Sequence, residues 1–545
     1  MTETPLAEAV RLHRQGDLAG AIRGYRAIIA ADARDAGASS NLGVALRATG
    51  DNDGAIEVFV QALAYNPDHN DLAYNYGNAL RDKGENAGAV EQYTKVLARD
   101  PAYLGAGLNL AIVQARLGQH EDAAAACLAA LKHHPLNADL HLNLGVAYWR
   151  LGRLEAAVAA YRRALGFDAT RDQIPYNLGI ALEQLGEHEA ALQALDKAME
   201  LAPGKPDTLG AIGQSLVSVG RTEEARGYFA RALEQQAEHL DSHLGIARAL
   251  LLEGKLAAAW DEYDWHRKRN LNEDPNLAGP RWDGSDPRGK TILVYGEQGF
   301  GDTLQFARYC PMLTARGAKV ILRIVRPLVR IMTTLQGVMQ IVTPEDPLPA
   351  YDFFCPMMDL PRHFGTDLAT IPAQVPYLRS QAARSQLPNL VRVGLVWAGS
   401  SRHQKDRLRS LQLNDFAPLF GIAGVSFFSL QLGEAKAQLA DSPFRDFIAD
   451  ATPHLRDFAD TAEVLPGLDV LISVDTAIVH LAGALALPVW MLVPYAPDWR
   501  WLLDRDDTPW YPTMKLYRQV KSKGWVETME TVADALRALA VTKRT

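Results

Sequence analysis

Small and apolar residues recur every 34 positions through the first half of the 545-residue chain. Glycine marks this pattern eight times, at Gly16, Gly50, Gly84, Gly118, Gly152, Gly186, Gly220 and Gly254. Alanine follows five positions later in every unit, at Ala21, Ala55, Ala89, Ala123, Ala157, Ala191, Ala225 and Ala259. A repeat of this length predicts two helices per unit, with glycine ending the first and alanine letting neighbouring helices approach. We therefore expect an α-solenoid of about eight repeats over residues 1–268.

A large residue occupies the position four residues after most of these alanines. This position holds Tyr25, Phe59, Tyr93, Tyr161, Phe229 and Tyr263, with Cys127 and Leu195 in the other two units. Residues four apart lie on one face of a helix, so these side chains are predicted to fill the space beside the alanines.

Asparagine occupies one position of the first helix in five consecutive units, at Asn41, Asn75, Asn109, Asn143 and Asn177. Helix propensity does not account for it, because asparagine is a poor helix former. Stacked units would set these amides in a ladder along the concave surface, where each donor and acceptor suits an extended peptide. The alternative is that each amide bridges adjacent repeats or caps a neighbouring carbonyl, which would be equally regular.

Beyond the repeats, short β-branched runs alternate with helical stretches. A segment rich in glycine, proline, asparagine and aspartate at 269–289 predicts a linker. Strands are predicted at 291–296, 319–324, 339–343, 391–399, 425–432, 469–474 and 488–493. Such alternation favours parallel sheets covered by helices. We expect an α/β module of two Rossmann-like halves, residues 290–388 and 389–545, that face a cleft.

A glycine-rich turn, Gly299-Phe300-Gly301-Asp302, follows the first predicted strand. Its glycine spacing differs from the dinucleotide fingerprint, and Arg323 and Arg326 stand where a ribose-binding acid is expected. The turn still places the Asp302 carboxylate at the C-terminal edge of the sheet, where such folds bind ligands. Asp302 is therefore a candidate catalytic residue, with a role as helix N-cap as the alternative.

A second motif begins where the strand at 469–474 ends. Asp475, Thr476 and Ala477 open a helix of small residues that carries His480. A helix N-terminus presents free amides and the positive end of the dipole, and Thr476 adds a hydroxyl donor, so this motif suits a diphosphate. The alternative is an ordinary capped helix with a buried histidine.

A polar loop after the strand at 391–399 faces the same predicted cleft. It contains Ser400, Ser401, Arg402, His403, Lys405, Arg407 and Arg409. Exposed basic loops are usually only solvated, but a second anion-competent element on this half strengthens the interpretation of an anion site. Gln431 ends the next strand at the same edge and is a candidate nucleobase contact.

The aromatic segment 497–512 contains Trp499, Arg500, Trp501, Trp510 and Tyr511, which could shape the cleft by stacking or brace the return of the C-terminal helix, and bracing is the favoured interpretation. Within it, Asp504-Arg505-Asp506 has the spacing of a metal-binding DxD motif. The surrounding residues predict a solvated loop, so we expect no metal site there.

Composition narrows the possible partners and setting. A formal net charge of −8 argues against nucleic acid as a partner. Cys127, Cys310 and Cys355 are far apart and odd in number, which argues against a disulfide framework and a cysteine-based metal cluster. No run of residues has the character of a targeting or membrane-spanning segment, so we expect a cytoplasmic protein.

The combined motifs resemble a known family. The repeat units resemble tetratricopeptide repeats. The GxGD turn, the Ser400-Ser401 pair followed by Lys405, and the DTAxxHLA sequence at Asp475 are similar to those of heptosyltransferase-type GT-B glycosyltransferases. Their fusion to asparagine-bearing repeats resembles bacterial protein O-glycosyltransferases, including the flagellin-modifying type, and more distantly the O-GlcNAc transferases.

This resemblance implies a metal-independent enzyme that takes a sugar from a nucleotide-sugar co-substrate and needs no other cofactor. It implies that Asp302 is the general base on the acceptor hydroxyl. Donor phosphates and ribose would be contacted by Ser400, Ser401, Lys405, Asp475, Thr476, Ala477 and His480. The expected acceptor is a protein segment in the repeat groove. The alternatives are a glycolipid or oligosaccharide acceptor, with repeats that recruit other proteins, and a non-catalytic scaffold with a degenerate transferase module.

Overall fold

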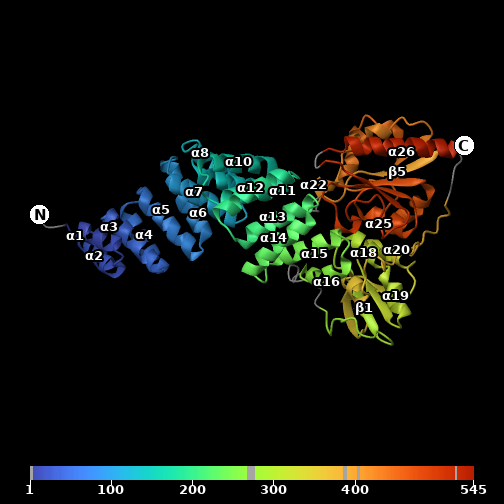
Figure 1. Cartoon of the computed structure of the whole chain (residues 1–545). Coiled ribbons are helices and arrows are strands. Elements are labelled where there is room, and N and C mark those ends of the chain that lie inside the picture. Colours follow the sequence, from blue (N-terminus) through green and yellow to red (C-terminus); the bar gives the residue numbers. More distant parts are fainter. Residues whose placement is uncertain (1–3, 267–276, 385–388, 402–405, 522–523, 545) are drawn as a thin grey trace. The chain divides into compact units, whose positions relative to one another are not determined.

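The computed structural model describes residues 4–266, 277–384, 389–401, 406–521 and 524–544. The chain divides into two compact units, Met1–Leu185 with Gln193–Pro203 and Gly186–Leu192 with Gly204–Thr545. The first unit is helical, and the second contains the last repeats and two parallel sheets (Figure 1). None of the described helices is both long and apolar enough to cross a membrane.

Helix pairs follow the 34-residue pattern throughout the repeat region, which confirms the predicted solenoid. The first ten helices, which form five pairs, are α1 (Pro5–Arg14), α2 (Leu18–Ala31), α3 (Ala36–Ala48), α4 (Asn52–Tyr65), α5 (Asn70–Lys83), α6 (Asn86–Arg99), α7 (Leu104–Arg116), α8 (His120–Leu131), α9 (Ala138–Arg150) and α10 (Leu154–Phe167). The remaining six are α11 (Gln173–Gln184), α12 (His188–Leu201), α13 (Pro206–Ser218), α14 (Thr222–Gln235), α15 (Leu240–Leu252) and α16 (Leu256–Tyr263). The glycine between the helices of each pair has φ between +71° and +90° at all eight positions, as a left-handed helix end requires.

The alanine and aromatic columns form the core between paired helices. All eight alanines are buried, with at most 2% of their surface exposed. The large residue packs against a glycine of the first helix, and a Cβ atom on Gly43 would lie 2.2 Å from the Phe59 ring. Tyr263 in the last repeat departs from this pattern, because it is only half-buried and its hydroxyl accepts a hydrogen bond from Gln298 Nε2 at 3.2 Å.

The first α/β half has a four-stranded parallel sheet in the order β3-β2-β1-β4. Its strands are β1 (Thr291–Tyr295), β2 (Lys319–Arg323), β3 (Val338–Val342) and β4 (Phe353–Pro356). The first three match predicted strands, whereas β4 was missed because it is short and ends in proline. Trp282 is buried, and its backbone N–H donates a hydrogen bond to the Phe354 carbonyl at 2.8 Å. Part of the segment predicted as a linker therefore packs on this sheet.

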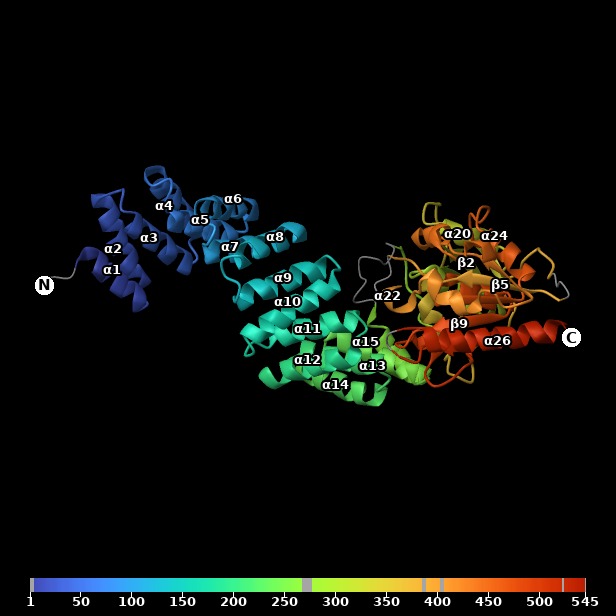
Figure 2. The same cartoon turned by 90° about the horizontal axis from the view of Figure 1, so that it is seen from above.

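The second half has a six-stranded parallel sheet in the order β10-β9-β8-β5-β6-β7. Its strands are β5 (Val391–Val396), β6 (Val425–Ser429), β7 (Ile448–Asp450), β8 (Val470–Val474), β9 (Val489–Val493) and β10 (Met514–Arg518). Read from β7, this is the doubly wound order, which reverses between β5 and β8. The predicted parallel α/β character is therefore confirmed, although the edge strands β7 and β10 were not predicted. Figure 2 shows α26 (Val526–Arg544) lying along this sheet.

The last repeat packs on both α/β halves. Trp260 in α16 is buried, and its Nε1 donates to the Thr366 carbonyl of the first half at 3.1 Å. The same ring meets Trp499 of the second half edge-on, with 6.1 Å between ring centroids. One tryptophan thus fixes the end of the repeat array against the module that carries the candidate site.

Candidate functional site

A cavity of about 1360 Å³ lies between the two α/β halves, where β1, β5, β6 and β8 end. It is lined by eight of the predicted site residues: Asp302, Ser400, Ser401, Gln431, Asp475, Thr476, Ala477 and His480. Lys405, together with Arg402 and His403, falls outside the described residues. In doubly wound sheets, ligands bind beyond the carboxyl ends of the strands at the point where the order reverses, and the loops after β5 and β8 meet there.

The N-terminus of α25 (Ala477–Ala484) faces this cavity. Thr476 is the N-cap residue, yet its side chain forms no capping hydrogen bond. Its Oγ1 is buried and has no hydrogen-bond partner among the described residues. A hydroxyl donor and the first amides of α25 therefore lie together at the positive end of the helix dipole, an arrangement that binds phosphate groups.

His480 lies one turn into α25 and is only 5% exposed. Burial, assisted by Arg500, lowers the pKa of its imidazole to about 3, so the ring is neutral near pH 7. Its Nδ1 lies 3.1 Å from the Tyr511 hydroxyl oxygen. A Cβ atom on Gly301 would lie 2.8 Å from its Cδ2, so the glycine allows α18 (Phe300–Phe306) of the first half to approach α25. His480 is thus an uncharged, buried side chain at the cavity wall.

Asp475 stands directly before the N-cap, beside the anion-competent amides. Its Oδ2 accepts a hydrogen bond from Trp501 Nε1 at 2.9 Å. Burial and the nearby Asp498 raise the pKa of Asp475 to about 6. A protonated carboxyl group repels a bound anion less than a carboxylate, so this residue makes the site more favourable to anions at mildly acidic pH.

Asp302 belongs to the first turn of α18, on the wall formed by the first half. Its Oδ2 accepts a hydrogen bond from the Gly299 N–H at 3.0 Å, so Asp302 supports the helix start from the third helical position, whereas the N-cap residue itself is Gly299. Its Oδ1 forms a short ion pair with Arg500 Nη2. The side chain remains 24% exposed, so Asp302 supports the start of its helix and also presents a carboxylate to the cavity.

Arg500 lines the cavity, which is the role that the sequence-based interpretation ranked below bracing. Its Nη1 donates to Asp498 Oδ1 at 2.9 Å and its Nε to Gln305 Oε1 at 2.7 Å. The guanidinium carbon lies 4.5 Å from the centroid of the Trp499 ring. Burial opposes its charge, but Asp498 and Asp302 outweigh burial and raise the pKa of Arg500. The sequence signal that could have identified Arg500 is an arginine among aromatic residues, shortly after a strand of the second sheet.

Gln431 does not take the predicted role of a nucleobase contact. Its Oε1 accepts hydrogen bonds from the Trp397 and Ala398 N–H groups, each at 2.9 Å. Its Nε2 donates to the Ala398 and Leu432 carbonyls at 3.0 and 2.8 Å. All four hydrogen-bonding positions of the amide are therefore used within the protein. Gln431 instead fixes the loop after β5 that carries the two serines.

Two loops with predicted ligand-binding motifs differ in whether they line the cavity. Ser400 and Ser401 are exposed and line it beyond the end of β5. The described residues that line the cavity do not include Asp504 or Asp506. Arg505 pairs with Asp507 instead, so the DxD sequence lies in a polar loop as expected.

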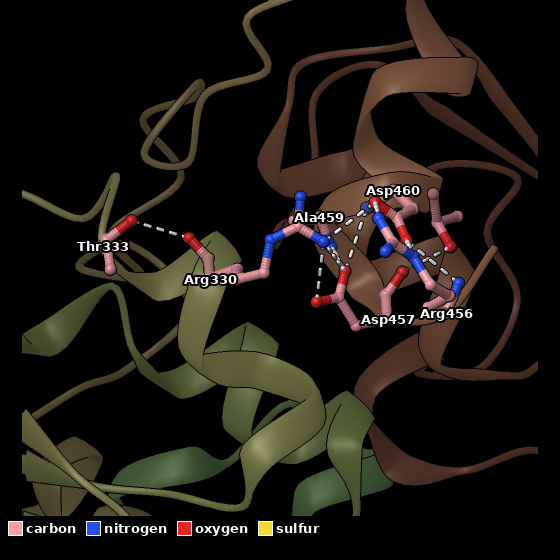
Figure 3. A network of polar contacts seen from close by, with 7 residues as sticks. Arg330, Thr333, Arg456, Asp457, Ala459 and Asp460 are labelled. Carbon is pink, nitrogen blue, oxygen red and sulfur yellow. Dashed lines mark hydrogen bonds and ion pairs between the residues drawn. The ribbon is translucent and has the colours of Figure 1, made fainter. Parts of the chain in front are cut away.

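An ion-pair network joins the two halves at another border of the cavity (Figure 3). Arg330 Nη1 of α20 (Arg326–Met332) lies 3.0 Å from Asp457 Oδ2 and 2.8 Å from Asp460 Oδ1. Asp460 lies in the first turn of α24 (Phe458–Val464) and also pairs with Arg456 Nε at 3.0 Å. Arg330 is 53% exposed, so water and salt weaken these contacts between the halves.

The asparagine column lies along first helices that contact one another from repeat to repeat. All five members are half-buried: Asn41, Asn75, Asn109, Asn143 and Asn177. Asn75 Nδ2 donates to Ser40 Oγ at 3.0 Å, and Asn109 Nδ2 donates to Asn78 Oδ1 at 2.8 Å, in each case to the preceding repeat. Asn143 Nδ2 donates to a carbonyl of its own helix at 2.8 Å. Asn75 and Asn109 therefore bridge repeats, whereas Asn143 bonds locally.

Comparisons with known proteins identify the repeats. A tetratricopeptide-repeat family model matches residues 6–60, 45–103, 108–173 and 211–265, and a second matches residues 174–205. Residues 6–265 are thus tetratricopeptide repeats, a class that binds protein or peptide partners. The curated relative Protein FlbA of Caulobacter vibrioides is 25% identical over 326 residues, which are 54% of this chain and 54% of FlbA. The chain therefore spans about half the length of that relative.

Two solved structures resemble part of the chain. The crystal structure of MamA is 28% identical and covers 31% of this chain and 92% of its own, with a TM-score of 0.30. PilF of Pseudomonas aeruginosa is 19% identical and covers 39% of this chain and 96% of its own, with a TM-score of 0.35.

Proposed function

We propose that this protein is a GT-B glycosyltransferase that moves a sugar from a nucleotide-sugar donor to a hydroxyl group of a protein. The observation that carries the proposal is the N-terminus of α25, where the unbonded Thr476 hydroxyl shares one cavity with the Asp302 carboxylate. A phosphate-binding element and a candidate base from opposite halves are the two parts that sugar transfer from a nucleotide requires.

The donor diphosphate would lie at the N-terminus of α25, with the backbone amides and Thr476 donating to its oxygens. Ser400 and Ser401 would approach it from the neighbouring loop after β5. Sites for one small ligand have about 300–1,000 Å³. The cavity of about 1360 Å³ therefore has room for a nucleotide sugar and the hydroxyl-bearing part of an acceptor.

In the transfer step, Asp302 would take the proton of the acceptor hydroxyl while its oxygen bonds to the anomeric carbon. The bond from that carbon to the donor phosphate breaks, and its electron pair leaves with the nucleoside diphosphate. The amides of α25 and the Arg500 guanidinium stabilise the charge that develops on the leaving group. This route uses no metal ion.

The repeats favour a protein acceptor. Tetratricopeptide repeats bind protein segments, and here they adjoin the α/β module through Trp260. Replacing Asn41 and Asn177 together by alanine separates a protein acceptor from a glycolipid or oligosaccharide acceptor, because the amides of Asn75, Asn109 and Asn143 are bonded within the array. Loss of transfer to protein with unchanged donor hydrolysis supports the protein acceptor, and unchanged transfer to protein contradicts it.

The donor site is tested by thermal shift with UDP-, GDP-, ADP- and CMP-sugars on the full chain. A ligand that binds only the folded state raises the melting temperature. One nucleotide class should stabilise the wild type but not Thr476→Val. Thr531→Val is the matched control, because its hydroxyl bonds to the Glu527 carbonyl within α26. The absence of stabilisation by all four classes would favour the alternative of a non-catalytic scaffold.

A further inference from the structure

We propose that donor binding draws Arg500 away from Asp302, so that the base becomes available only when a donor is present. The inference rests on the proposed glycosyltransferase function and adds a role for a residue in the same cavity. Arg500 would contact the donor diphosphate directly and would also control the charge environment of the base.

The contacts of Arg500 make this exchange possible. Its guanidinium has five N–H donors, and among the residues that the structure describes three side-chain acceptors contact it: Asp302 Oδ1, Asp498 Oδ1 and Gln305 Oε1. A planar guanidinium with charge and spare donors matches phosphate oxygens closely. Asp498 and Arg500 belong to the second half, whereas Asp302 belongs to the first. Two of these acceptors, Asp302 and Gln305, belong to the first half and so contact Arg500 across the cavity. Of these two, Asp302 is the one that carries a charge.

Electrostatics favours the exchange when a diphosphate arrives. Arg500 lies in the same cavity as the N-terminus of α25, and its charge helps to lower the pKa of His480 in that helix. A diphosphate bound at α25 would carry about two negative charges, against one on Asp302, and would lie in a partly buried site where Coulomb attraction is strong. Although burial opposes ionisation of Asp498, Arg500 lowers its pKa. Asp498 therefore stays ionised and anchors the guanidinium as it turns.

The consequence is an order of events. Without donor, both oxygens of the Asp302 carboxylate are engaged, one by Arg500 and the other by the Gly299 N–H. With donor present, Arg500 stabilises the departing phosphate and Asp302 is free to accept the hydroxyl proton. Donor binding thus precedes productive binding of the acceptor hydroxyl.

The test uses inorganic pyrophosphate as the probe, titrated into the full chain by isothermal calorimetry. We expect wild type to bind pyrophosphate, Arg500→Met to bind it at least about tenfold more weakly, and Asp302→Asn to bind it about five- to tenfold more tightly, because one charge-assisted pair no longer competes. Arg505→Met is the matched control, an arginine of the same segment paired outside the cavity, and should match wild type.

Removing Asp302 also removes direct repulsion of the probe, and a double-mutant cycle separates the two effects. If Asp302 acts through Arg500, its substitution should not tighten binding in the Arg500→Met background. Equal tightening in both backgrounds, or unchanged affinity in Asp302→Asn, overturns the inference while leaving the donor site intact. Failure of wild-type protein to bind pyrophosphate would instead contradict the anion site of the proposed function. If Arg500→Met does not fold, Arg500→Gln, which also removes the charge, serves as the second background of the cycle.

Discussion

Arg500 Nη2 and Asp302 Oδ1 form an ion pair that joins the two α/β halves inside the candidate site. Both residues line the same cavity as the N-terminus of α25. The close approach of Gly301 to His480 brings the first turn of α18 beside α25, so the candidate base and the amides at the start of α25 lie on touching helices. The pair therefore couples the two groups that would act on opposite sides of the reacting sugar.

Asp302→Asn is expected to reduce sugar transfer by at least about 100-fold, because general-base catalysis contributes about 10²–10⁴-fold. Nucleotide binding should survive, since the proposed phosphate site at the start of α25 belongs to the other half. Transfer is measured as sugar incorporated into an acceptor protein. The control is Asp346→Asn, whose carboxylate caps the Thr343 N–H at 2.8 Å outside the described cavity lining. Wild-type activity in Asp302→Asn would eliminate this residue as the base.

His480 and Asp475 are expected to change stability with pH in opposite directions. The pKa of His480 falls to about 3, against about 6.5 in an unfolded chain, so between these values the unfolded chain binds more protons and acidification destabilises the fold. The pKa of Asp475 rises to about 6, against about 3.9 when unfolded, so between these values the folded chain binds more protons and acidification stabilises it. One proton accounts for at most about 1.4 kcal/mol per pH unit.

Calorimetric melting at pH 7 and pH 5 tests these signs. On acidification, the melting temperature of His480→Gln should fall less than that of wild type, and the melting temperature of Asp475→Asn should fall more. Shifts in the same direction for the two variants would contradict the burial argument.

Local sequence predicted most of the architecture because its signals are strong and periodic. The glycine and alanine columns define the repeats, and the β-branched runs define seven strands. The strands β4, β7 and β10 escaped prediction, since they are short or lie at a sheet edge, where tertiary pairing decides the structure. The anion-competent start of α25 was visible as Thr476 after a buried strand.

Long-range contacts were not visible in the same way. The partner of Asp302 is Arg500, which lies 198 residues further along the chain, and only the closure of the two halves brings them together. Gln431 misled for a related reason, because its amide is saturated by the backbone of a loop that begins more than 30 residues earlier. Residue type and strand position showed that these side chains reach the edge of the sheet, but not what they contact there.

Asn109 should contribute more to stability than Asn143. Asn78 Oδ1 is buried and accepts hydrogen bonds from both Tyr93 and Asn109, so Asn109→Ala removes a bridge between repeats. A loss of about 1 kcal/mol in unfolding free energy is expected. Asn143→Ala removes only a bond within its own helix and should cost less. Denaturant unfolding measures both, and a larger cost for Asn143→Ala would contradict the bridging role of Asn109.

Two glycine substitutions in one repeat should have opposite effects on stability. A Cβ atom on Gly213 in α13 would lie 2.6 Å from Phe229 Cε1, so Gly213→Ala overpacks the core and should cost about 1–3 kcal/mol. Gly227 in α14 is exposed, and an added Cβ atom meets nothing within 4 Å. Gly227→Ala should stabilise by about 0.5–1 kcal/mol, because alanine loses less backbone entropy in a helix. The measurement is denaturant unfolding followed by circular dichroism, and equal effects of the two substitutions would show that the Phe229 contact does not require a glycine.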